Sequence, residues 1–195
     1  VFATTGALVS SRKQMDIFGF ALLATAAGIG GGTLRDVFLG QLPVFWVQKP
    51  AYLLTCVLVS CAAFFVAHLV QSRQRLLIWA DAVGLALFSV TGADIAQSQG
   101  VGSVIAIALG VATATFGGII RDILGGDSPV ILRREIYVTA ALLGSSVFAM
   151  CLHLGLAKNL SLAAGFMAAL ALRAAAIRFD LSLPIFVYSG GNNNS

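Results

Sequence analysis

The chain contains very few charged residues. Only 10% of its 195 residues are Asp, Glu, Lys or Arg, whereas 58% are hydrophobic and the mean hydropathy is +0.94. A soluble globular domain carries about 25% charged residues, so the composition excludes an ordinary soluble protein and indicates an integral membrane protein. The net charge is +4, but the basic residues are scattered between apolar stretches. This distribution fits membrane orientation and gives no reason to expect a nucleic-acid partner.

The chain also lacks the motifs of metal centres and enzymes. Its three cysteines, Cys56, Cys61 and Cys151, lie inside apolar segments without CxxC spacing, so neither a disulfide framework nor a metal site is expected. The sequence contains no P-loop, no HExxH motif and no nucleophile paired with a base. We therefore expect no enzymatic activity, no cofactor and no structural metal.

What the chain does contain is an internal repeat. Segments 31–44 and 117–130 are identical at seven of fourteen positions, including two glycines and an Arg-Asp pair, where composition alone gives about one match. The register also holds upstream without a gap, since Phe2 and Thr5 match Phe88 and Thr91. The repeating unit is therefore about 86 residues long.

Apolar segments predict the number of membrane crossings. Taking about 20 apolar residues as one crossing, the predicted spans are 1–11, 15–32, 51–70, 76–97, 101–119, 136–156 and 159–177. The first is short by comparison with its repeat partner, so we expect about eleven residues to precede Val1 in a longer natural protein. Because each repeat holds three spans, an odd number, the second copy must be inverted in the membrane.

The expected fold is thus an all-α membrane protein with seven transmembrane helices. Residues 1–74 form the first three-helix repeat, 75–157 the second, inverted repeat, 158–179 a seventh helix and 180–195 a cytoplasmic tail. With the N-terminus outside, only Lys49 and Lys158 face outward. The inner face then receives seven basic residues: Arg12, Lys13, Arg73, Arg75, Arg133, Arg134 and Arg178. This asymmetry predicts an external N-terminus and a cytoplasmic C-terminus.

The repeated glycines predict special behaviour of the second and fifth helices. Each Gly costs about 1 kcal/mol relative to Ala in a helix, so both helices should break or kink at Gly30, Gly31 and Gly32, and at Gly117 and Gly118. Two broken helices entering from opposite faces would frame a path for polar solutes. The alternative is that small residues simply permit close helix packing.

The Arg-Asp pairs that follow the glycines are the main candidate site. An Arg or Asp at the bilayer centre costs on the order of 3 kcal/mol, so the four residues should face inward and pair. Adjacent helical residues point about 100° apart, which favours pairing across the repeats, Arg35 with Asp122 and Arg121 with Asp36. These residues would then form one central site. The alternative is that the charges lie at interfacial depth and snorkel.

Other polar residues in the spans are secondary candidates. Asp81 and Asp94 could attract cations at a pore mouth, although Asp81 could equally stand at a helix start, favoured by the helix dipole. Hydroxyl groups that could line a polar path belong to Ser89, Thr91, Thr113 and Thr115. Each of these could instead bond to a carbonyl of its own helix.

The sequence resembles the trimeric intracellular cation (TRIC) channel family, in its prokaryotic branch of small seven-span proteins, some labelled as glycine-transporter-domain proteins. The motifs that carry the resemblance are Thr5-Gly6-Ala7, Met15-Asp16-Ile17-Phe18-Gly19, Gly30-Gly31-Gly32-Thr33-Leu34-Arg35-Asp36, Asp81-Ala82-Val83-Gly84-Leu85, Gly117-Gly118-Ile119-Ile120-Arg121-Asp122 and Leu183-Pro184. The resemblance implies a homotrimer with one pore inside each subunit and second and fifth helices kinked around the ion path.

The same resemblance bears on lipids and voltage. In animal members the block matching Arg35-Asp36-Val37 reads Lys-Glu-Val and is implicated in anionic lipid recognition, which implies a possible bound lipid here. Residues 76–97 contain no Lys or Arg to match the basic residue used for voltage-dependent block in animal fourth helices. Voltage control of that type is not expected.

The sequence therefore favours a passive monovalent cation channel, permeable to K⁺ or Na⁺, in a bacterial or archaeal plasma (inner) membrane. Neither repeat contains a TVGYG potassium filter, so selection among cations should be weak. The alternatives are a secondary transporter for glycine or another small zwitterion, for which paired Arg and Asp are suitable, and a membrane scaffold whose repeats only pack.

Overall fold

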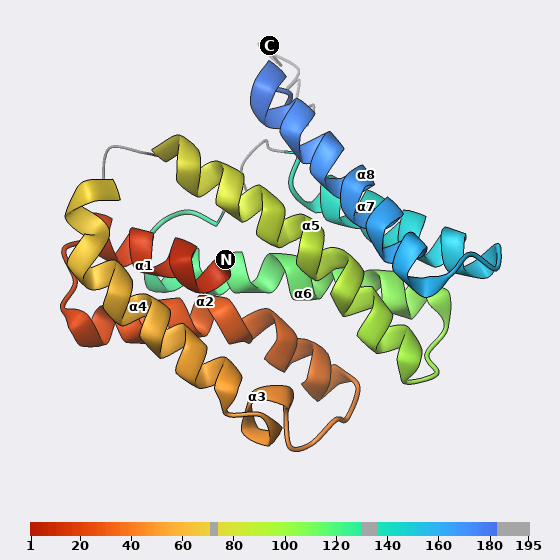
Figure 1. Cartoon of the computed structure of the whole chain (residues 1–195), viewed down its shortest axis with the longest axis horizontal. Helices are drawn as coiled ribbons and strands as arrows, with labels where there is room; N and C mark the ends of the chain where they lie inside the picture. Colours follow the sequence, from red (N-terminus) through yellow and green to blue (C-terminus); the bar gives the residue numbers. More distant parts are fainter. Residues whose placement is uncertain (71–73, 130–135, 183–195) are drawn as a thin grey trace, which may run out of the picture.

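The protein is described by a computed structural model that covers residues 1–70, 74–129 and 136–182. The described residues form eight helices and no extended sheet (Figure 1). The helices are α1 (Phe2–Arg12), α2 (Ile17–Phe38), α3 (Phe45–Gln48), α4 (Ala51–Val70), α5 (Gln74–Ser98), α6 (Ser103–Leu124), α7 (Val138–His153) and α8 (Lys158–Phe179). Arg73, Arg133 and Arg134 of the orientation argument, the Leu183-Pro184 motif and most of the expected tail lie outside the described residues.

The helices reproduce the 86-residue period of the sequence. Helices α2 and α6 have 22 residues each and begin at Ile17 and Ser103, so they match residue for residue. They also end alike, because Gly40 and Gly126 have φ of 65° and 69°, the left-handed conformation that glycine adopts without strain. In both turns the amide three residues past the helix donates to the carbonyl of the repeated Asp at 2.8 Å. The two copies therefore share local structure as well as sequence.

Helices α2 and α6 cross antiparallel at their glycines (Figure 1). A Cβ on Gly31 would collide with the carbonyl oxygen of Thr113, and a Cβ on Gly117 would lie 2.5 Å from the carbonyl oxygen of Ala27. Ala27 and Thr113 are themselves repeat partners. Small residues at both contacts thus let the two backbones touch.

A break or a kink was expected at the glycines, and the break does not occur. Helix α2 continues through Gly30, Gly31 and Gly32 to Phe38, and α6 continues through Gly117 and Gly118 to Leu124. The expected ends at residues 32 and 119 were therefore wrong. The low helix propensity of glycine is offset here by close interhelical packing, which only glycine permits, so close packing is what these glycines serve in this structure.

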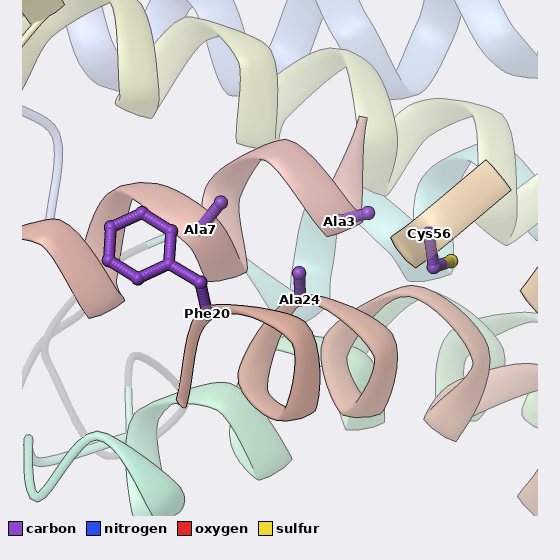
Figure 2. Close-up of a cluster of buried hydrophobic side chains, with 5 residues drawn as sticks. All are labelled: Ala3, Ala7, Phe20, Ala24 and Cys56. Atoms are coloured by element: carbon purple, nitrogen blue, oxygen red, sulfur yellow. The ribbon is translucent and has the colours of Figure 1, made fainter. Parts of the chain in front are cut away.

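The other helices pack around this crossing. Helix α1 lies on α2, with Ala3 and Ala7 against Phe20 and Ala24, and Cys56 of α4 completes this buried cluster (Figure 2). Asp16 precedes helix α2 and caps it, because its carboxylate accepts a hydrogen bond from the Gly19 amide at 2.8 Å. Helices α7 and α8 pack on each other and on α5.

Within the part of the chain that the structure describes, four helical segments are long and apolar enough to cross a membrane, namely Ile17–Phe38, Ile78–Ser98, Ser103–Leu124 and Lys158–Phe179. Ala51–Val66 and Val138–His153 are shorter apolar helical segments. Together with the exposed aliphatic and aromatic side chains along these helices, this makes the protein an all-helical membrane protein.

Candidate functional site

A cavity of about 490 Å³ opens beside the α2–α6 crossing. Its walls come from α2 to α6 and combine charged, amide and aromatic side chains. The lining residues are Gly28, Gly32, Arg35, Asp36, Gln41, Phe45, Gln48, Lys49, Tyr52, Leu87, Phe88, Thr91, Ile95 and Thr113. A cavity of this size, with a few charged and amide groups in a mainly apolar wall, can hold water and a small solute.

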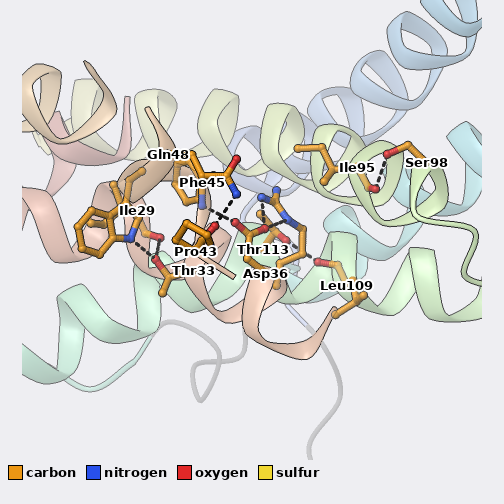
Figure 3. Close-up of polar contacts among 12 residues, drawn as sticks. Ile29, Thr33, Asp36, Pro43, Phe45, Gln48, Ile95, Ser98, Leu109 and Thr113 are labelled. Atoms are coloured by element: carbon orange, nitrogen blue, oxygen red, sulfur yellow. Dashed lines mark hydrogen bonds and ion pairs between the residues drawn. The ribbon is translucent and has the colours of Figure 1, made fainter. Parts of the chain in front are cut away.

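The first Arg-Asp pair forms part of the cavity wall. Arg35 donates to Asp36 Oδ1 from Nε at 2.9 Å and from Nη2 at 2.6 Å. Asp36 Oδ2 accepts the Phe45 backbone N–H at 2.8 Å, at the start of α3 (Figure 3). The Arg35 guanidinium lies 5.8 Å from the Phe45 ring centroid, within cation–π range. Asp36 thus holds both the Arg35 side chain and the first residue of α3 in place.

The second Arg-Asp pair is more deeply enclosed. Arg121 bonds Asp122 Oδ1 from Nε at 2.9 Å and donates from Nη1 to Asp81 Oδ1 at 2.8 Å and to Thr5 Oγ1 at 3.0 Å. All four residues are at most 5% exposed. Arg121 therefore joins α1, α5 and α6 through one buried charge network.

The expected pairing across the repeats was wrong. Arg35 binds Asp36 and Arg121 binds Asp122, each within its own helix. A 100° difference in side-chain direction does not prevent this, because the long Arg side chain curls back to the adjacent carboxylate.

The four charges also do not form one central site. Arg35 and Arg121 each lie four residues past the crossing glycine, about 6 Å farther along their own helices. Because the helices are antiparallel, these steps lead in opposite directions. The structure has two Arg-Asp sites, one on each side of the crossing.

The remaining candidates divide into cavity and packing positions. Thr91 and Thr113 line the cavity, while their hydroxyls donate to Leu87 and Leu109 carbonyls. Ser89 and Thr115 are buried and bond carbonyls of their own helices, outside the cavity lining.

The two other carboxylates occupy different environments. Asp81 lies within α5, seven residues after Gln74, so it does not stand at a helix start. It belongs to the buried network and not to the cavity lining. Asp94 forms an ion pair with Lys158 at 2.8 Å, joining α5 to α8. Its expected role at a mouth has no support from the cavity lining.

Sequence reasoning missed the residues that α3 and the start of α4 contribute. Phe45, Gln48, Lys49 and Tyr52 line the cavity. The first three follow the repeated block in what reads as a loop, and Tyr52 lies in the predicted span 51–70. The available signal was Pro43 followed by aromatic residues, a segment too apolar for an ordinary loop. A four-residue helix is too short for its periodicity to be recognised.

Comparisons with known proteins agree with this architecture. The model of a family described as "Glycine transporter" matches residues 1–68 and 78–153. The chain is 40% identical over 190 residues to a UPF0126 membrane protein of Vibrio cholerae, covering 95% of this chain and 78% of that protein. It is 39% identical to the inner membrane protein YadS of Escherichia coli K12, covering 95% and 91%.

The chain is also similar to solved structures of TRIC channels. The TRIC channel orthologue of Rhodobacter sphaeroides is 60% identical, with a TM-score of 0.90 over 92% of this chain and 93% of that one. A second TRIC cation channel is 33% identical, with a TM-score of 0.88 over 95% and 92%. The chain is therefore a multi-pass protein of the bacterial inner membrane that belongs to the glycine transporter (UPF0126) family and is a homologue of the prokaryotic TRIC channels.

Proposed function

We propose that the protein is a monovalent cation channel, permeable to K⁺ and Na⁺, with a pore inside each subunit of a homotrimer. The observation that carries the proposal is the match to the Rhodobacter sphaeroides TRIC channel, at 60% identity over nearly the whole of both chains. The cavity supports it, because charged groups of Arg35, Asp36 and Lys49 lie in its wall together with Thr113 from the helix crossing.

We also propose the membrane topology of the two repeats. Residues 1–74 and 75–157 would be inverted three-helix repeats, with 158–179 as the seventh span and the 180–195 tail in the cytoplasm. The stacked rings of Phe2 and Phe88, 5.0 Å apart, support a pseudo-twofold axis between the copies, because the two residues are repeat partners. With the N-terminus outside, the Arg35 cavity opens to the exterior and the Arg121 network lies in the inner half.

The proposed pore wall carries two cations, Arg35 and Lys49, and one carboxylate, Asp36. Asp36 attracts cations, but Arg35 holds one of its oxygens and the Phe45 amide holds the other. A carboxylate so occupied cannot replace much of an ion's hydration shell. We therefore infer weak cation binding and weak K⁺ over Na⁺ selection, with Gly31 and Gly117 as the flexible points where α2 and α6 would bend.

Planar bilayers test the channel directly. Purified protein under a K⁺ gradient should give unitary currents that reverse near the K⁺ equilibrium potential when the anion is impermeant. Empty bilayers and heat-denatured protein are the controls. Silent bilayers with correctly folded protein would refute the channel.

Replacing Asp36 with Asn should lower K⁺ conductance by about threefold. Removing one unit charge about 6 Å from a hydrated ion changes its energy by about 0.7 kcal/mol in a water-like dielectric, and the change leaves Arg35 uncompensated. Asp94→Asn is the matched control, because the Asp94 carboxylate pairs with Lys158 outside the cavity lining. Equal conductance of the two variants would contradict a role for Asp36 in the pore.

The second candidate is a transporter of glycine or another small zwitterion. The family description favours it, and so does a cavity that combines a carboxylate with the cations Arg35 and Lys49. Liposomes with the protein reconstituted in their membrane should then accumulate labelled glycine with saturable kinetics, while planar bilayers show no unitary currents.

A further inference from the structure

The short helix α3 contacts α2 on two sides. Phe45 lines the cavity together with Gly32, whereas the next residue of each helix, Trp46 and Thr33, lines a separate groove. This groove has a volume of about 410 Å³ and a mainly apolar wall from α2, α3 and α6. Two adjacent residues of α3 thus face two different hollows, and only the first of them borders the proposed pore.

The Phe45 ring lies in a notch that Gly32 leaves in α2. A Cβ on Gly32 would lie 2.7 Å from Cε1 of this ring, so only glycine leaves the ring its place. The ring also meets Tyr52 edge-on, with centroids 5.1 Å apart, and lies 5.8 Å from the Arg35 guanidinium. Because α2, α4 and the Arg35 side chain occupy these sides, a ring displaced from the notch would move into the cavity.

A hydrogen bond on the groove side fixes α3. Trp46 Nε1 donates to Thr33 Oγ1 at 3.0 Å, and Thr33 Oγ1 donates to the Ile29 carbonyl at 2.8 Å (Figure 3). Because the Thr33 hydrogen is directed to its own helix, the hydroxyl oxygen faces the indole as an acceptor. The bond therefore ties α3 to α2 one residue away from both Phe45 and Gly32.

The second repeat lacks this pair of groups. The repeat partners of Thr33 and Trp46 are Ile119 and Leu132, which have neither a hydroxyl nor an indole N–H. The crossing glycine and the Arg-Asp pair, by contrast, occur in both copies. Neither of those features therefore requires the bond between Thr33 and Trp46, and its effect falls on α3 and the cavity that α3 borders.

We propose that Thr33 and Trp46 are positioning residues of the pore, whose hydrogen bond keeps the Phe45 ring in the Gly32 notch and thereby keeps the cavity open. Neither Thr33 nor Trp46 lines the cavity. Without their bond, the Asp36 carboxylate still holds the Phe45 backbone N–H, so α3 stays attached while its side chains shift. This inference rests on the proposed channel, and names residues outside the pore on which its conductance depends.

Access to the cavity tests this role without relying on conduction. In a background with all three cysteines replaced by alanine, purified Thr91→Cys protein is treated with a cationic methanethiosulfonate, because Thr91 lies in the cavity wall. Thr33→Val keeps the side-chain shape but loses the hydroxyl, and should slow the modification by up to about fivefold, the effect of losing one hydrogen bond. Thr33→Ser keeps the hydroxyl and should react as fast as the Thr33 protein.

Two further changes decide whether the Phe45 ring is the obstacle. Phe45→Ala removes the ring and should return the Thr33→Val protein to fast modification, although it restores no contact of α3. Gly32→Ala should slow the modification even with Thr33 and Trp46 intact, because its methyl group displaces the ring from the notch. Gly30→Ala is the matched control, since a Cβ there would meet only the side-chain tip of Ile120.

Unitary conductance in planar bilayers should follow the same order as the modification rates. If Thr33→Val and Thr33→Ser react alike, or if Phe45→Ala does not restore the rate, the positioning role is refuted, while bilayers that conduct keep the channel. If the modification rates behave as expected in a protein that gives no currents, the channel fails while the placement of Phe45 by Thr33 and Trp46 stands.

Discussion

Arg121→Gln is expected to destabilise the protein by about 3 to 5 kcal/mol, the usual loss when one partner is removed from a buried ion pair. Arg121 lies between the Asp81 and Asp122 carboxylates, which are 5% and 4% exposed. Glutamine cannot compensate two negative charges, and helices α5 and α6 hold both carboxylates in place. The variant therefore removes the cation that compensates two buried carboxylates.

The repeat supplies a matched control. Arg35→Gln removes the same residue from the same local sequence, but Asp36 keeps the Phe45 amide and borders a cavity that water can enter. Arg35→Gln should therefore lose less stability than Arg121→Gln. Thermal unfolding of both variants in detergent, followed by size-exclusion chromatography, measures the difference, and equal midpoints would contradict the assigned network.

Asp81→Asn should restore part of the stability of Arg121→Gln, because it removes one of the two uncompensated charges. In the wild-type background the same change should be destabilising, since Arg121 then loses a partner. This sign reversal is the signature of direct coupling in a double-mutant cycle. A uniform loss in both backgrounds would indicate that Asp81 stabilises α5 independently of Arg121.

The repeat determined much of what could be predicted. Because both copies had to fold alike, the starts of α2 and α6 near Ile17 and Ser103 followed from the apolar pattern and the period. The other long helices could be located from the length of their apolar segments. The ends of α2 and α6 were missed, because propensity alone suggested that glycine would stop them. Close contact with a facing helix decided otherwise, as the alternative interpretation of the small residues allowed.

The sequence predicted several residues that line the cavity, but not how these residues pair or where the cavity lies. Arg35, Asp36, Thr91 and Thr113 do line the cavity, since buried polar groups in a membrane helix need a polar environment. Their partners depended on the antiparallel crossing, which separates the two Arg-Asp pairs. The cavity itself depended on α3, whose first amide is fixed by Asp36. Neither the antiparallel crossing nor the short helix α3 produces a periodic pattern in the sequence.

The second large effect is expected at the crossing glycines. Gly31→Ala and Gly117→Ala should each destabilise the protein by about 3 kcal/mol, the upper end of the usual range for overpacking. The added methyl group would meet a backbone carbonyl, of Thr113 or Ala27 respectively. A backbone carbonyl cannot move away as a side chain can, so α2 and α6 would have to separate.

The neighbouring glycine provides the control for this prediction. A Cβ on Gly30 would meet the terminal methyl of Ile120, a side-chain tip that can rotate. Gly30→Ala should therefore be neutral or stabilising, since alanine gains about 1 kcal/mol of helix propensity. Unfolding midpoints of the three variants decide between two functions of glycine. If Gly31→Ala and Gly117→Ala were as stable as Gly30→Ala, the glycines would serve bending alone, and the close crossing would not be what holds the two repeats together.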